Sequence, residues 1–145
     1  MRKLYNAAAT YTAAGLVAGV YYRELTKAHS FTGTTQLAFV HTHLLALGTL
    51  FFLIVMVLEK NFTLTASQWF PLFFITYQAG LVIAATMFTI HGTLDVLGKS
   101  SGPVLSWIAG LGHIGLAMGL LMFFLALRER VFAPSDAEAK ATTKA

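Results

Sequence analysis

A long apolar run, residues 37–58, constrains the fold of this chain more than any other feature. It contains no Asp, Glu, Lys or Arg. As a helix it is about 30 Å long, at about 1.5 Å per residue, which matches the hydrocarbon thickness of a bilayer. His41 and His43 stand near its start. Because an ionisable side chain is costly inside a membrane, the run predicts a transmembrane helix whose histidines have partners.

The composition also indicates a membrane protein. Hydrophobic residues make up 57% of the 145 residues and charged residues only 11%, whereas a soluble domain has about 25% charged residues. The chain has no cysteine, which excludes disulfides, thiolate metal sites and thiol chemistry. The net charge of +4 does not indicate nucleic-acid binding, because the basic residues flank apolar runs instead of forming a patch.

Four apolar segments predict an all-α fold, an integral membrane four-helix bundle in one domain, residues 1–130. A polar, flexible tail is predicted for residues 131–145. Small residues in the first and last spans predict close helix contacts and association with a second copy of the chain. The predicted spans are about 4–22, 37–58, 69–97 and 104–127.

The basic residues predict the orientation in the membrane. With four spans, both termini lie on the same side, and seven of the ten Lys and Arg residues lie on that side. The other three are Arg23, Lys27 and Lys99. The positive-inside rule therefore places the N- and C-termini in the cytoplasm.

Histidines from three spans are predicted to lie at one level in the outer half of the membrane. His43, His91 and His113 are each expected roughly 9–15 Å below the outer surface, counting about 1.5 Å per residue. His41 lies about 3 Å above His43 on the same helix. Residues i and i+2 of a helix point about 200° apart, so His41 and His43 face different neighbours. This spacing disfavours a compact zinc site and favours a larger, flat ligand.

Haem b is the cofactor that this pattern favours. Two neutral imidazoles from facing helices can bind its iron from both sides while the ring fills an apolar slot. Arg23, with Lys27 and Lys99, is expected to meet the haem propionates at the outer surface. Glycines near the histidines are expected to leave room for the ring: Gly48, Gly92, Gly110 and Gly112.

Each candidate also has a simpler interpretation. Buried histidines often only join helices by hydrogen bonds, and the glycines of the last span are also suited to helix packing. His29 is interpreted as a surface residue. Asp95 shares a helix face with His91 and either orients that imidazole or is solvated at the interface. His113 can pair with His41 or replace a member of the His43–His91 pair. The candidate ligands of a haem or another metal are His43, His91, His113 and His41.

Two motifs carry a resemblance to a known family. Residues 41–48, His-Thr-His-Leu-Leu-Ala-Leu-Gly, resemble the His-x-His-x-x-x-x-Gly motif of haem–copper oxidase subunit I and its nitric-oxide-reductase relatives. Ile90-His91-Gly92 resembles the His-Gly motif of an early helix in that family. The resemblance implies that His43 and His91 ligate a low-spin haem b and that His41 faces a second site. The helices occur in the opposite order here, and no His-x-x-x-Tyr copper motif is present, so oxygen reduction is not implied.

The whole chain resembles a small family of bacterial four-helix membrane proteins of unknown function. This resemblance implies the fold and a place in the bacterial cell membrane, but no activity. The expected functions of a haem protein of this kind are electron transfer, haem handling or gas sensing. The alternatives are a transition-metal or proton-coupled transporter and a structural or assembly subunit. No nucleophile–base pair, phosphate loop or paired carboxylates indicate an enzyme.

Overall fold

The computed structural model describes residues 1–100 and 102–132, and every regular element among them is a helix. The segments α2, η1 and α3 follow one another without a break and form one long helix, Leu37–Phe62. The all-α prediction is thus confirmed for this part of the chain, while most of the predicted tail lies outside it. The elements are α1 (Arg2–Ala28), α2 (Leu37–His43), the π-helical η1 (Leu44–Leu50), α3 (Phe51–Phe62), the 3₁₀ turn η2 (Leu64–Ala66), α4 (Phe70–Val96) and α5 (Pro103–Val131).

Three helices are long and apolar enough to cross a membrane: Leu37–Phe62, Phe70–Val96 and Pro103–Val131. The first predicted span also forms a helix, but its Ala, Gly, Thr and Tyr residues make α1 less apolar than the other three. Helix α1 continues to Ala28 and α5 to Val131, beyond the predicted ends at 22 and 127. Hydropathy marks where the apolar part of a helix ends, whereas polar residues such as Arg and Glu continue the helix itself.

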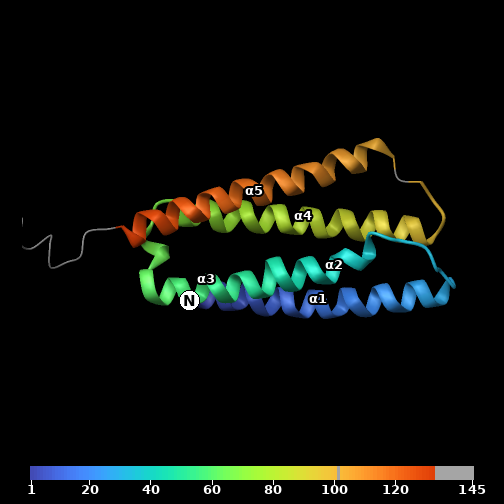
Figure 1. The fold of residues 1–145 in the computed structure, drawn as a ribbon, viewed down its shortest axis with the longest axis horizontal. Helices are drawn as coiled ribbons and strands as arrows, with labels where there is room; N and C mark the ends of the chain where they lie inside the picture. The colour runs from blue at the N-terminus through green and yellow to red at the C-terminus, as the bar shows by residue number, and fades with distance from the viewer. Residues whose placement is uncertain (101, 133–145) are drawn as a thin grey trace, which may run out of the picture.

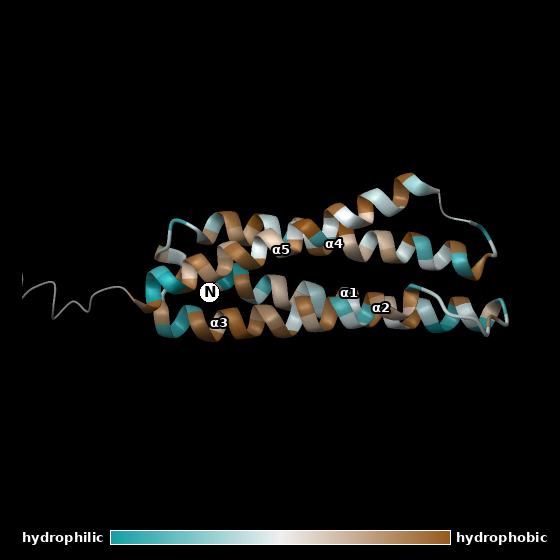
Figure 2. Ribbon diagram, turned by 45° about the horizontal axis from the view of Figure 1, so that its top comes forward, coloured by the Kyte–Doolittle hydropathy of each residue, from teal (hydrophilic) through white to brown (hydrophobic). Residues whose placement is uncertain are grey.

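The helices form two antiparallel pairs that lie side by side (Figure 1). One pair is α1 with Leu37–Phe62, and the other is α4 with α5. The N-terminus, the α3–α4 connection and the end of α5 lie at one end of the molecule, called here the termini end. The α1–α2 and α4–α5 connections lie at the opposite, far end, where α5 diverges from α4 (Figure 1). Figure 2 shows hydrophilic residues near both ends and hydrophobic residues along most of α3.

An aromatic core joins the two pairs in the half near the termini. Phe51 stacks on Tyr77 of α4, with ring centroids 4.5 Å apart, and Phe52 stacks on Tyr11 of α1 at 5.8 Å. Phe52 and Phe73 are fully buried. Since these rings come from α1, α3 and α4, they fix the first helical pair against the second.

Glycines let α4 and α5 approach until their backbones touch. A Cβ on Gly119 would lie 2.6 Å from the Cα of Tyr77, and one on Gly112 would lie 2.8 Å from the backbone nitrogen of Ala84. Gly80 packs in the same way on the backbone of Leu116. The last-span glycines at 112 and 119 therefore serve helix packing, the simpler of their two interpretations.

The start of α2 is attached to α4 by hydrogen bonds. The Thr35 hydroxyl donates to the Gly92 carbonyl at 2.8 Å and accepts from the Leu37 amide at 3.2 Å. The Gln36 amide donates to the Asp95 carboxylate at 3.3 Å. Asp95 thus supports the beginning of α2, a role that the sequence analysis did not predict.

Replacing Thr35 with valine should therefore destabilise the protein. The change keeps the shape of the side chain but leaves the buried Leu37 amide without its acceptor, which is expected to cost about 1–3 kcal/mol. The midpoint of thermal or detergent unfolding, followed by circular dichroism, measures the effect. Thr34→Val is the control, because Thr34 is exposed; equal midpoints for the two variants would contradict the assigned role of Thr35.

Candidate functional site

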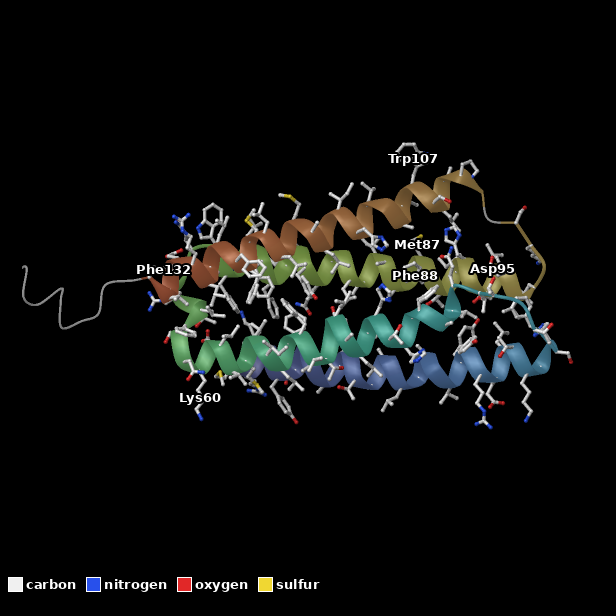
Figure 3. The ribbon with its side chains drawn as sticks, viewed as in Figure 1. Lys60, Met87, Phe88, Asp95, Trp107 and Phe132 are labelled. Carbon is white, nitrogen blue, oxygen red and sulfur yellow. The ribbon has the colours of Figure 1, made fainter. Side chains whose placement is uncertain are left out.

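Phe88 of α4 contacts histidines of two other helices. Its ring centroid is 4.9 Å from that of His43 in α2 and 5.7 Å from that of His113 in α5, and both contacts are edge-on. Phe39 packs on the same ring at 6.3 Å. Figure 3 shows Phe88 and Met87 on the part of α4 from which α5 diverges. We call Phe39, His43, Phe88 and His113 the Phe88 cluster.

His43 and His113 share one hydrogen-bond arrangement. The Nδ1 atom of His43 lies 2.8 Å from the Phe39 carbonyl, and that of His113 lies 3.0 Å from the Ala109 carbonyl. Because a carbonyl only accepts, Nδ1 carries the proton in both hydrogen bonds. In the neutral imidazole this leaves the lone pair on Nε2. Each ring is thus held by its own helix with a ligand atom available.

His91 and His41 each contain a buried nitrogen without a hydrogen-bond partner among the described residues. These atoms are Nε2 of His91 and Nδ1 of His41. His91 is only 5% exposed, and His41 is half-buried. Buried polar atoms are usually paired, so both nitrogens are candidates for a ligand, water or a partner side chain.

The two histidines of the His-x-His pair face different helices. A Cβ on Gly19 of α1 would lie 3.8 Å from the Cβ of His41, whereas His43 contacts Phe88 of α4. This is the divergence that the i, i+2 spacing predicts. His41 is therefore outside the Phe88 cluster.

The heights of His43 and His91 follow from the contact between α2 and α4. The backbone of Leu37 packs directly on Gly92, so the start of α2 is level with Gly92. At about 1.5 Å per residue, His43 then lies roughly 8 Å nearer the termini end than His91.

The height of His113 follows in the same way from the contact between Gly112 and Ala84. His113 lies roughly 5 Å nearer the termini end than His43, counting about 1.5 Å per residue. The predicted common level is therefore wrong in detail, since the three histidines spread over roughly 12 Å along the helices. The reason is that α2 begins level with Gly92 instead of at the end of α4. His43 is closer in height to His113 than to His91.

Three of the four glycines that were expected to leave room for a haem are filled by helix contacts. Gly92 packs on the backbone of Leu37, Gly48 on Tyr11, and Gly112 on Ala84. A Cβ on Gly110 would meet nothing within 4 Å among the described residues. The expectation is thus wrong for the first three, and open space remains beside Gly110 of α5.

Arg23 does not contact the histidines. Its side chain is 77% exposed on α1, and its Nη1 atom lies 3.8 Å from the carboxylate of the neighbouring Glu24. Lys99 instead lines a recess of about 870 Å³ at the far end. Phe39 belongs both to this recess and to the Phe88 cluster.

The predicted ligands do not form a ready-made metal site. Within residues 1–100 and 102–132, no three His, Asp or Glu side chains are grouped as ligands of one ion. An apolar groove of about 510 Å³ between α1, α2 and α4 is lined by none of the histidines. The site is therefore two imidazoles in contact with one aromatic ring, that of His43 half-buried and that of His113 exposed, together with the buried imidazole of His91.

These features define an all-helical protein with three helices of membrane-spanning length and imidazoles on neighbouring helices. The chain belongs to the family described as protein of unknown function, DUF2871, which matches residues 1–130. The predicted membership in a family of unknown function is thus confirmed. The match shows no link to haem–copper oxidases. No curated protein and no solved structure matches the chain.

Proposed function

We propose that this protein is an integral membrane four-helix bundle that binds haem b for electron transfer. The three apolar helices of 26, 27 and 29 residues support membrane insertion. So do large apolar side chains on their outer surfaces. Trp107 of α5 is 80% exposed and points away from the other helices (Figure 3). Exposed large apolar side chains of this kind suit a lipid environment.

Helix α1 is the fourth member of the proposed bundle. It packs along the whole of Leu37–Phe62, which supports its crossing the membrane beside that more apolar helix. Both ends of the described chain lie at the termini end (Figure 1), in agreement with an even number of crossings. The excess of basic residues there supports a cytoplasmic location for the termini in the bacterial cell membrane.

His43 and His113 are the residues that would hold the haem iron. The observation that carries this proposal is that both contact Phe88, each with Nδ1 hydrogen-bonded and Nε2 available. The carbonyls of Phe39 and Ala109 orient the two rings and increase their basicity, as partners of metal-bound histidines commonly do. This pair replaces His43–His91, because His113 contacts the same ring as His43 and is closer to it in height.

The donor set fits haem better than a small ion. Two imidazoles from different helices suit an iron bound from both sides, and no group of three ligand side chains occurs in the described chain. When bound, the haem supplies a one-electron redox centre. A haem held by two imidazoles of the chain would favour electron transfer over gas sensing. The divergence of α5 from α4 at the far end supports entry of the ring there.

A reduced-minus-oxidised optical spectrum of the detergent-purified protein tests this proposal. We expect a Soret band and sharp α and β bands on reduction, with about one haem b per chain in a pyridine haemochrome assay. A protein that stays colourless after expression in haem-replete cells and incubation with hemin would refute haem binding. Elemental analysis of such a colourless protein would then separate a metal transporter from a structural subunit.

A further inference from the structure

A π-helical segment directly follows the His-x-His pair. At its end, the Phe51 amide donates to the Ala46 carbonyl five residues back. At its start, the Leu44 amide still bonds the Val40 carbonyl four residues back. A π segment accommodates an extra residue within an otherwise α-helical chain, and such segments often occur at functional sites.

Side chains of α4 and α1 hold this segment from two sides. The Tyr77 hydroxyl of α4 donates to the Leu47 carbonyl at 2.9 Å, and Tyr77 is only 1% exposed. On the α1 side, the hydroxyls of Thr12 and Thr49 are 3.0 Å apart. Tyr77 therefore gives a carbonyl of the π segment a partner from outside its own helix.

The parts of the long helix before and after the π segment are each held by packing contacts of their own. Its start is held by the contact of Leu37 with Gly92, and its continuation is held by Phe51 on Tyr77 and Phe52 on Tyr11. An α-helix turns about 100° per residue. A regular α-helix over the same residues would therefore turn the His-x-His pair by about 100° relative to the aromatic core, whereas the π segment absorbs the extra residue and keeps both anchors in register.

We propose that η1, held by Tyr77, sets the direction in which the His-x-His pair points. With the π segment intact, His41 faces Gly19 of α1 and His43 faces Phe88 of α4. Tyr77 is a positioning residue that acts through the backbone of Leu47. The consequence for haem ligation rests on the function proposed above, whereas the consequence for the direction of the pair does not.

Disulfide formation measures that direction without any cofactor. The chain contains no cysteine, so Gly19→Cys with His41→Cys introduces one defined pair. The expected Cβ–Cβ distance of 3.8 Å is the usual distance across a disulfide. The protein should form this bond readily under mild oxidation in detergent or in lipid vesicles.

Three changes in this cysteine background test the proposal. Deleting the exposed Ala46 removes the extra residue, so a regular α-helix should keep position 41 facing α1 and disulfide formation should stay within about twofold of the parent rate. Inserting one alanine after Ala46 should slow disulfide formation at least about tenfold, because the additional residue turns position 41 away from α1 by about 100°. Tyr77→Phe should slow it about fivefold, the effect of losing one hydrogen bond of ordinary strength. Tyr11→Phe is the matched control, a buried tyrosine of the same core whose hydroxyl has no hydrogen bond among the described residues. It should leave the rate unchanged.

A folded deletion variant as slow as the insertion variant, or an insertion variant at the parent rate, would overturn the proposal. Helix content by circular dichroism shows whether these variants fold, and if they do not, Tyr77→Phe decides in their place. With His41 restored, Tyr77→Phe should shift the low-spin electron paramagnetic resonance signal of the oxidised protein, and Tyr11→Phe should not. A parent protein without haem would refute the proposed function alone, since the disulfide rates still decide the role of η1.

Discussion

Replacing His43 with alanine is expected to abolish the haem b spectrum of the purified protein. The change removes one of two proposed iron ligands while the helix keeps its length and its apolar surface. His113→Ala removes the other and should have the same effect. We expect a loss of bound haem of at least about tenfold in each case, since even partners outside the ligand set change metal affinity about 10–100-fold. The pyridine haemochrome assay measures the haem per chain.

His29→Ala is the control for both variants. His29 makes the same kind of hydrogen bond, from Nδ1 to the carbonyl of Leu25 four residues earlier at 3.0 Å, but it is exposed and lies outside the Phe88 cluster. Its replacement should leave the spectrum unchanged. Full haem in both His43→Ala and His113→Ala would contradict the proposed ligands. Loss in His91→Ala with retention in His113→Ala would assign the second ligand to His91.

Replacing Gly80 with valine is expected to separate α4 from α5. A Cβ there would lie against the Leu116 amide nitrogen and 2.7 Å from the carbonyl carbon of Gly115. Both atoms belong to the backbone, so neither can move without shifting the whole of α5. The free energy of unfolding should fall by about 3 kcal/mol, the upper end of the usual cost of overpacking. Detergent unfolding followed by circular dichroism measures it.

Gly110→Val is the matched control on α5. A Cβ at that position meets nothing within 4 Å among the described residues, so the change should alter the free energy of unfolding by less than about 1 kcal/mol, the difference in helix propensity alone. Equal unfolding curves for the two variants would mean that the backbone contact between α4 and α5 contributes little. The same separation would also move His113 from Phe88, so Gly80→Val should lower haem binding as well.

The helical elements were largely predictable from the sequence. The uncharged run 37–58 and the apolar runs 69–97 and 104–127 each became a helix that ends within a few residues of the expected positions. Long apolar segments bounded by turns carry this information locally. The divergence of His41 and His43 was predictable too, because it depends only on helical geometry.

The partners of the histidines were not predictable. His43 contacts Phe88 and lies nearer in height to His113 than to His91, because α2 begins where Leu37 meets Gly92. A count of residues from the predicted ends of each span cannot contain that offset. The roles of the glycines also depend on which helix faces them: Gly92 and Gly112 receive backbone, whereas Gly110 faces open space.

The sequence by itself determined that this chain is helical, apolar over three long segments and equipped with histidines on neighbouring helices, because helix formation and hydropathy act over short stretches of chain. Only the tertiary structure decided which aromatic ring the histidines contact, which glycines are filled, and that Leu44–Leu50 is π-helical beside Tyr77. Those features depend on contacts between residues about 25 to 55 positions apart, such as Leu47 with Tyr77, Phe88 with His43 and His113, and Leu37 with Gly92. Their geometry is set when whole helices pack, at the points where small residues allow backbones to approach.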